Sequence, residues 1–196
     1  MHQNRVDPLG ALHAVPQRGA WMGNRGCLHD AEARIVRGHV GRRWITCVTD
    51  FRGRRRALMQ PGRYTELFFL DEATACAAGH RPCAECRRAD WLAFRDRWQS
   101  VFADTGADAI DARLHAARLD GRARRLVGVE AGAVPEGAMI LHHGAPLLRA
   151  RGDWWRWSFD GYTAAVAPQT RVALLTPLPL AQLMAAGWRV QNAVPN

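Results

Sequence analysis

The sequence predicts an α+β protein in three parts, and one observation on each part carries this prediction. Residues 1–88 contain short alternating stretches and one short helical stretch, which indicate a small domain of strands with a helix. Residues 89–125 carry apolar side chains at helical spacing, which indicates a helical middle. Residues 126–196 return to short alternating stretches separated by Gly, Pro and Asp, which indicates a β-rich C-terminal part with a final short helix.

The composition sets the size of the core. The chain has 196 residues, of which 48% are hydrophobic and 23% are charged. A chain of this length buries one good-sized core or two small ones, and this composition is ordinary for a globular protein. Disorder of the whole chain is therefore disfavoured.

The first part is expected to contain two strands. Residues 1–26 are rich in Gly and Pro and lack periodicity, so we expect an extended arm or an irregular edge of this domain. Residues 43–51 read RWITCVTDF and alternate, and residues 64–70 read YTELFFL, so each stretch is expected to form a strand.

Helix signals follow these strands. Asp71 is placed as the N-cap of a short helix over residues 72–78, and Gly79 is placed to end it. A longer amphipathic helix is expected over residues 89–102, where four apolar side chains recur at helical spacing: Trp91, Phe94, Trp98 and Val101. Residues 103–125 continue helical and polar, and their charged end, LDGRARR, is expected to be a hinge.

The C-terminal part contains three strand-like stretches and one helical stretch. The strand-like stretches read AMILHHG, DWWRWSFDGY and RVALLTPL, with Gly, Pro and Asp between them. The stretch LAQLMAAG is expected to form the last short helix.

Positive charge favours a polyanionic partner. The formal net charge is +9, and all 27 basic residues are arginines, which bind phosphate through paired N–H groups and stack on bases. Between residues 34 and 63 nine arginines accompany a single acid, Asp50. We expect a nucleic-acid-binding surface formed by Arg42, Arg43, Arg52, Arg54, Arg55, Arg56, Arg81, Arg87 and Arg88.

The sequence also bears on the compartment. The N-terminus lacks the apolar segment of a signal peptide, and the most apolar late segment, VALLTPLPLAQLMAAGW, is interrupted by prolines and polar residues. We therefore expect no membrane contact and a cytoplasmic location. Five cysteines in that compartment are expected to be metal ligands or buried thiols rather than disulfides.

The motif Cys83-x-x-Cys86 predicts a metal site. It places two thiols on one tight turn, as a tetrahedral zinc site requires, and Pro82 stiffens the entry to that turn. A Cys-x-x-Cys pair also serves redox chemistry, but redox motifs open a helix after a strand, whereas this motif follows a helix end. Zn²⁺ is therefore the expected cofactor.

A longer stretch around this motif resembles a known family. Residues 64–88 read YTELFFLDEATACAAGHRPCAECRR and are similar to the second half of the Ada-type metal-binding domain. The similar positions are the Phe pair, the helix end, the Arg-Pro step and the Cys pair, with His80 at an aromatic position of the family: Phe68, Phe69, Ala78, Gly79, Arg81, Pro82, Cys83 and Cys86. The resemblance implies a zinc ion held by four cysteines, one of which accepts a methyl group from a methylated DNA phosphate.

The chain departs from this family in its other ligands, because it lacks the upstream Cys-x-x-x-Cys pair. Cys47, on the strand before the Phe pair, lies where the family has its first ligand, so it is our third ligand and our candidate for alkyl transfer. Cys27 and His29 share one face of an extended segment, so either could be the fourth ligand. His29 is preferred, because Asp30 or a carbonyl could orient its free ring nitrogen, and Cys27 is the alternative. Cys76 is expected to be a buried core thiol.

Three functions remain open. The leading one is a zinc-binding protein that binds nucleic acid, with DNA favoured, in DNA repair or damage recognition. The enzyme alternative is that the zinc site does chemistry, either by alkyl transfer to a zinc-bound cysteine or by zinc-activated hydrolysis. In the third, the zinc is structural and the basic face meets a protein or RNA partner.

Overall fold

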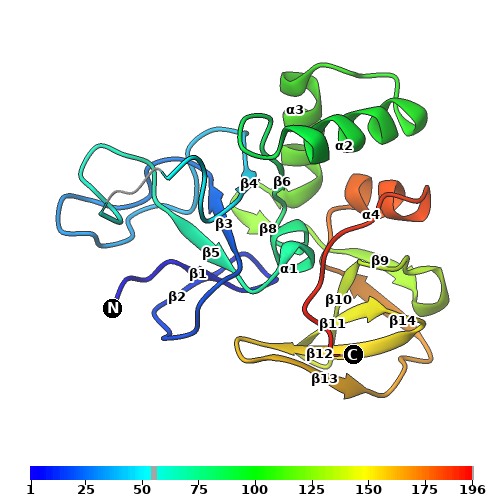
Figure 1. The fold of residues 1–196 in the computed structure, drawn as a ribbon. Coiled ribbons are helices and arrows are strands. Elements are labelled where there is room, and N and C mark those ends of the chain that lie inside the picture. Colours follow the sequence, from blue (N-terminus) through cyan, green and yellow to red (C-terminus); the bar gives the residue numbers. More distant parts are fainter. Residues whose placement is uncertain (54–56, 196) are drawn as a thin grey trace.

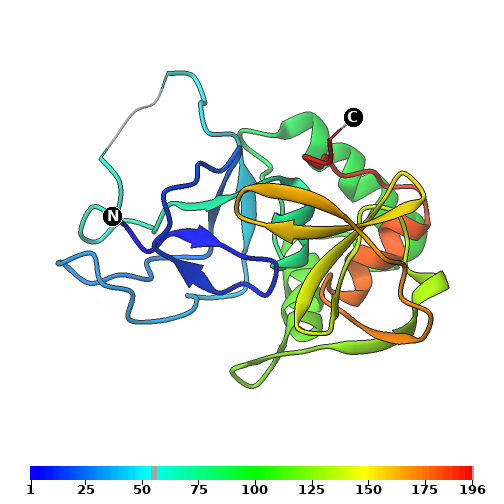
Figure 2. The ribbon, with the colours of Figure 1, turned by 90° about the horizontal axis from the view of Figure 1, so that it is seen from below.

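A computed structural model describes residues 1–53 and 57–195 of the chain. Within these residues it contains four α-helices and three β-sheets, so the predicted α+β class is confirmed. The two larger sheets lie on opposite sides of the molecule, and the first helix packs between them (Figures 1 and 2). The C-terminal part is β-rich, as expected.

The N-terminal sheet is built from six short strands of mixed direction. Across the sheet they are, in order, β2 (Leu12–His13), β1 (Arg5–Val6), β5 (Leu67–Phe69), β3 (Trp21–Asn24), β4 (Ile45–Cys47) and β6 (Arg81–Pro82). The strands expected at residues 43–51 and 64–70 are present but shorter. β3 belongs to the stretch expected to be an arm or an edge, yet it lies inside the sheet between β4 and β5.

Gly23 explains how β3 fits between its neighbours. A Cβ atom at Gly23 would lie 2.3 Å from Cε2 of Phe69, so only glycine leaves room for this ring. Phe69 is fully buried, whereas Phe68 is only half-buried, because successive strand residues point to opposite faces. One face of the sheet thus contributes to the core and the other remains accessible.

Helix α1 (Glu72–Ala77) is buried along its whole length and begins as the sequence predicts. The Asp71 carboxylate accepts a hydrogen bond from the backbone N–H of Thr74 at 2.8 Å, which is the predicted N-cap. It also accepts a hydrogen bond from the Tyr162 hydroxyl at 2.8 Å, which ties the helix to the C-terminal sheet. Gly79 adopts φ +95°, a conformation that favours glycine, just after the helix ends.

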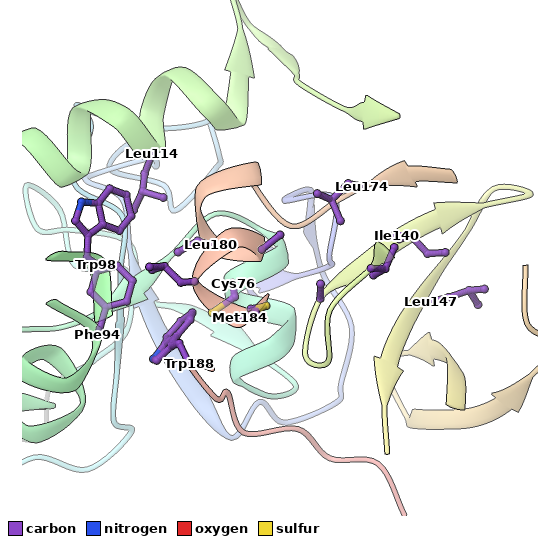
Figure 3. Close-up of a cluster of buried hydrophobic side chains, with 14 of the residues drawn as sticks. Cys76, Phe94, Trp98, Leu114, Ile140, Leu147, Leu174, Leu180, Met184 and Trp188 are labelled. Carbon is purple, nitrogen blue, oxygen red and sulfur yellow. The ribbon is translucent and has the colours of Figure 1, made fainter. Parts of the chain in front are cut away.

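Three further helices enclose the main apolar cluster: α2 (Arg88–Val101), α3 (Ala107–Arg118) and α4 (Leu178–Ala185). The predicted inner face of α2 is buried in this cluster through Trp91, Phe94 and Trp98. Figure 3 places Cys76 of α1 in the same cluster, and the residue is 1% exposed, as expected of a core thiol. Among the described residues, every helix is too short or too polar to cross a bilayer.

The segment expected to be a hinge forms a paired hairpin instead. β7 (Leu119–Asp120) pairs with β8 (Ala123–Arg124), and Gly121 between them has φ +60°. The two-residue turn between them, Gly121-Arg122, has glycine at its first position, where a tight hairpin turn needs a positive φ. The Arg124 side chain donates to the carbonyls of Ala77 and Leu175, so the hairpin fastens α1 to the C-terminal part.

The C-terminal sheet is antiparallel throughout its described pairs. Its strands are, in order, β13 (Gly161–Ala165), β12 (Asp153–Ser158), β11 (Ala145–Ala150), β10 (Met139–His142), β14 (Arg171–Leu174) and β9 (Val127–Glu130). A short 3₁₀ helix, Ala131–Ala133, follows β9. The sheet packs on α1 through an apolar cluster that includes Ala73, Ala77, Met139 and Leu148.

His80 lies in an unusual environment between α1 and β6. It is 0% exposed, its ring packs on Phe69 and Trp44, and neither ring nitrogen has a hydrogen-bond partner among the described residues. Burial lowers the pKa of His80 well below its ordinary value, and the charges of the buried arginines around it lower it further: Arg25, Arg118 and Arg124. His80 is therefore neutral in the folded protein.

Replacing His80 with phenylalanine is expected to make stability less sensitive to acid. Because the folded-state pKa lies below the unfolded value of about 6.5, the unfolded chain binds the extra proton, so wild-type stability falls as pH drops below about 6.5. The expected slope from this group is up to about 1.4 kcal/mol per pH unit. His80→Phe should lose this contribution, measured as unfolding free energy in urea from pH 7 to 5. His2→Phe, at the exposed N-terminus, should keep it, and parallel curves for wild type and His80→Phe would contradict the prediction.

Candidate metal centre

Three cysteine thiols meet at one edge of the N-terminal sheet. Cys47 ends β4, and Cys83 and Cys86 follow β6. β4 and β6 run parallel with Thr46 opposite Pro82, and the Cys83 backbone N–H donates to the Thr46 carbonyl at 2.9 Å. This register brings Cys47 beside Cys83, and the sulfurs of Cys47, Cys83 and Cys86 all lie within 4.8 Å of one another.

This arrangement fits a tetrahedral metal ion. A Zn–S bond is about 2.3 Å long, so two sulfurs on one zinc lie about 3.8 Å apart, which the observed spacing allows. All five cysteines of the chain are free thiols. The Glu85 backbone N–H donates to the Cys83 sulfur at 3.4 Å, and such contacts favour the thiolate that a metal binds. The cluster is therefore a candidate metal site with three cysteine ligands.

The three thiols differ in ionisation and access. The hydrogen bond between Cys47 and Cys83 lowers the pKa of Cys83 to about 5 and, together with burial, raises the pKa of Cys47. Burial raises the pKa of Cys86. Cys47 and Cys83 are each 7% exposed, whereas Cys86 is half-buried. Of the three, Cys86 rather than the expected Cys47 is thus the most accessible to an alkyl donor.

Arg87 holds the Cys-x-x-Cys turn in place. Its guanidinium pairs with Glu72 of α1 at 2.5 Å and donates to Asp90 of α2 at 2.8 Å, and it stacks over the Trp21 ring at 4.1 Å. The side chain is 2% exposed. It therefore cannot reach a nucleic acid, and its expected role in binding is replaced by a structural one.

Arg81 is also structural. Its guanidinium forms two hydrogen bonds to Asp111 of α3, at 2.8 and 2.7 Å, and stacks over Trp91 at 4.4 Å. Both partners of this ion pair are nearly inaccessible, with side chains 3% and 4% exposed. The pair fixes α3 to the strand that leads into Cys83, so Arg81 too leaves the expected nucleic-acid surface.

His29 and Cys27 lie outside the thiol cluster. The His29 ring nitrogens contact the Thr65 hydroxyl at 2.6 Å and the Gln60 carbonyl at 3.2 Å, so both are occupied within the protein. The Cys27 thiol donates to the His29 carbonyl at 3.6 Å. In the sheet, Cys47 lies opposite Met22, which comes five residues before Cys27. The chain at Cys27 and His29 therefore lies beyond the thiol cluster. Neither residue is placed as the fourth ligand.

All three thiols line one cavity of about 730 Å³ on the accessible face of the sheet. The lining also contains three carboxylates, three aromatic rings and six other side chains. These residues are Asp50, Glu66, Glu85, Phe51, Tyr64, Phe68, Met22, Asn24, Ile45, Val48, Thr49 and Leu58. No arginine belongs to the described part of this lining.

One long loop forms much of the cavity wall. We call residues 48–53 and 57–66, between β4 and β5, the rim loop; it leaves the sheet after Cys47 and returns to β5 at the end of the sheet where the segment between β3 and β4 lies. Of the expected nucleic-acid contacts, four are exposed and form no ion pair within the described residues: Arg42, Arg43, Arg52 and Arg88. Arg63 of the rim loop is likewise exposed. The remaining three, Arg54, Arg55 and Arg56, lie outside the described residues.

The sequence analysis did not predict two carboxylates of the cavity lining or the partner of Arg81. The carboxylates of Glu66 and Glu85 face the cavity without any motif to indicate it. Asp111 lies 30 residues from Arg81, so only the folded arrangement reveals their pairing. Comparison with protein-family models, with curated proteins and with solved structures found no match for this chain.

Proposed function

We propose that the protein binds one zinc ion through Cys47, Cys83 and Cys86 and binds nucleic acid, with DNA favoured, on the surface around this site. One observation carries the proposal: a three-thiol cluster opens onto a cavity whose rim loop carries exposed arginines. Zinc is preferred because thiolates in a tetrahedral set suit it well. The free thiols are consistent with the reducing cytoplasm.

The resemblance of residues 64–88 to Ada-type domains supports the same proposal and directs it toward DNA repair or damage recognition. Net charge supports it independently, since a formal charge of +9 attracts polyanions. The enzyme alternative is supported by the position of all three thiols in the cavity lining, where a substrate could reach them. A purely structural zinc would be better served by four protein ligands and a closed site.

Neutralising the rim arginines is expected to weaken nucleic-acid binding and flatten its salt dependence. Each phosphate contact contributes a slope of about 0.9 in log K against log salt on duplex DNA and about 0.7 on single strands. The double variant Arg52→Gln/Arg63→Gln should therefore lower the slope by about 1.4 to 1.8. The measurement is fluorescence anisotropy of a labelled oligonucleotide titrated with zinc-loaded protein at several salt concentrations.

The matched control is Arg122→Gln/Arg156→Gln. Both of these arginines are exposed, one in the β7–β8 turn and one on β12, so the control removes the same charge away from the cavity. An equal effect of the two double variants on the salt slope would show that binding depends on net charge and not on the arginines of the rim loop. Absence of binding by the wild type would overturn the proposed function.

A further inference from the structure

Three arginine side chains from separate parts of the chain lie close together in the interior. Arg25 follows β3, Arg118 ends α3 and Arg124 ends β8; we call these three residues the arginine cluster. Arg25 and Arg118 both lie over the Trp44 ring, with their guanidinium carbons 4.8 and 4.4 Å from its centre. They are 3% and 0% exposed, and Arg124 is half-buried. Burial lowers the pKa of Arg25 and of Arg118, and the charge of Arg124 lowers both further, so the three cations are near one another.

The cluster surrounds the C-terminal end of α1. The Arg124 guanidinium donates to the Ala77 carbonyl, and a Cβ atom at Gly79 would lie 3.3 Å from Nε of Arg118. Burial and then the charges of all three arginines lower the pKa of His80, the next residue of the chain. The carbonyl end of a helix carries about half of an elementary negative charge, and α1 has only six residues. The helix therefore offsets only a small part of three positive charges.

Positive charge exceeds negative charge around the cluster, since none of its members forms an ion pair within the described residues. Asp7 acts on two of them through its charge but already contacts His13 at 2.8 Å. Asp111 acts on the third but is already paired with Arg81 at 2.7 Å. Burial lowers the pKa of Arg118 to about 9 and that of each other member to about 10, so all three remain cationic at pH 7. A buried charge without a partner is costly, so an anion that neutralises part of this excess is favoured.

The cluster also contains hydrogen-bond donors without partners. Among the described residues, no acceptor contacts Nε of Arg25, Nε and Nη2 of Arg118 or Nε of Arg124, although all four atoms are buried. Both ring nitrogens of the neighbouring His80 are unpartnered as well. Stacking on Trp44 uses the face of a guanidinium, whereas its N–H groups lie in the plane, so stacking does not satisfy them. Ordered water could accept from these donors, but only an anion also neutralises the charge.

We infer that the arginine cluster binds one small inorganic anion, chloride or phosphate, next to the C-terminal end of α1. The unpartnered N–H groups donate to the anion, and such charge-assisted hydrogen bonds are about twice as strong as neutral ones. Because the three arginines come from the N-terminal part, α3 and the β7–β8 hairpin, the bound anion links these parts and stabilises the fold. The described lining of the thiol cavity contains no arginine, so this site is separate from the proposed function and independent of it.

The first test measures thermal unfolding of the purified full chain in sodium gluconate at pH 7, with part of the gluconate replaced by sodium chloride or sodium phosphate at constant ionic strength. Gluconate is too large for a site enclosed by buried side chains. An anion that binds only the folded chain raises stability with the logarithm of its concentration. We expect chloride or phosphate, at about one hundred times its dissociation constant, to raise the unfolding temperature by roughly 5 to 10 °C. Isothermal titration calorimetry in gluconate should give one site per chain.

The variant Arg124→Met then locates the site, because Arg124 is the most exposed member of the cluster. The substitution removes one charge and one unpartnered donor, so the anion should bind at least about tenfold more weakly, the loss expected of one hydrogen bond to a charged group. The matched control is Arg122→Met, which makes the same change at an exposed position of the same hairpin and should bind the anion as the wild type does. Circular dichroism verifies that each variant is folded.

Anion binding that is weakened in Arg124→Met and kept in Arg122→Met would support the site, and the anion with the lower dissociation constant would be its occupant. An unfolding temperature that is the same in all three salts would show that water alone contacts the donors, which overturns the inference. Equal anion affinities of the two variants would also overturn it, because the anion would then bind elsewhere. If Arg124→Met does not fold, the salt comparison and the calorimetry on the wild type still decide.

Discussion

Replacing Cys83 with serine is expected to abolish stoichiometric zinc binding and to destabilise the fold. The Cys83 thiol forms hydrogen bonds with both other thiols of the cluster, and its pKa is the one that is lowered, to about 5. Structural zinc in small domains contributes about 10 to 16 kcal/mol of apparent binding free energy, so loss of one thiolate removes a large part of it. Zinc content by mass spectrometry of the purified protein and thermal unfolding are the measurements. Cys47→Ser is expected to have the same effect if the strand cysteine is the third ligand.

The matched control is Cys27→Ser. It makes the same chemical change at a half-buried thiol outside the cluster, so zinc content and unfolding temperature should stay close to wild type. Loss of zinc in Cys27→Ser would instead show that Cys27, the alternative fourth ligand of the sequence analysis, binds the metal. If Cys83→Ser does not fold, the wild type still provides the test: a strong chelator should remove about one zinc per chain and lower the unfolding temperature reversibly. An unaffected wild type would contradict the metal site.

Local signals allowed much of the fold to be predicted. Asp71 and Gly79 mark the ends of α1 through their own backbone preferences, and the apolar spacing from Trp91 to Trp98 marks the buried face of α2. The position of β3 was not predictable in this way, because its place in the sheet depends on the packing of Gly23 against Phe69, 46 residues later.

In the candidate site, too, local features were predictable from the sequence and long-range contacts were not. The Cys-x-x-Cys motif is local, so its turn was predicted, and the parallel pairing of β4 with β6 supplies Cys47 from the expected strand. The choice of His29 rested on a local pattern that does not fix where the segment lies, and in the fold the His29 ring contacts Thr65 and Gln60 instead of the thiols. Arginine density likewise could not reveal that Arg81 and Arg87 are buried, since burial depends on acids from other helices.

The Arg81–Asp111 pair provides the second large prediction. Asp111→Ala is expected to lower the free energy of unfolding by about 3 to 5 kcal/mol, because it leaves the Arg81 charge buried without its partner. Since Arg81 immediately precedes the Pro82-Cys83 step, the variant should also bind zinc more weakly than wild type. Urea unfolding and a zinc competition titration measure the two effects. Replacing both partners by apolar residues, in Arg81→Met/Asp111→Leu, should cost less than Asp111→Ala alone, because no unpaired charge remains.

Asp104→Ala is the matched control for this pair. Asp104 also forms a two-point contact with an arginine, Arg113, and Arg113 lies on α3 like Asp111. However, the Arg113 side chain is 46% exposed, so water solvates the charge that the control leaves behind. We therefore expect a much smaller loss of stability and unchanged zinc affinity. Equal losses of stability in Asp104→Ala and Asp111→Ala would show that burial of the Arg81 charge does not determine the contribution of the pair. Unchanged zinc affinity in Asp111→Ala would show that the contact of α3 with Arg81 does not affect the metal centre.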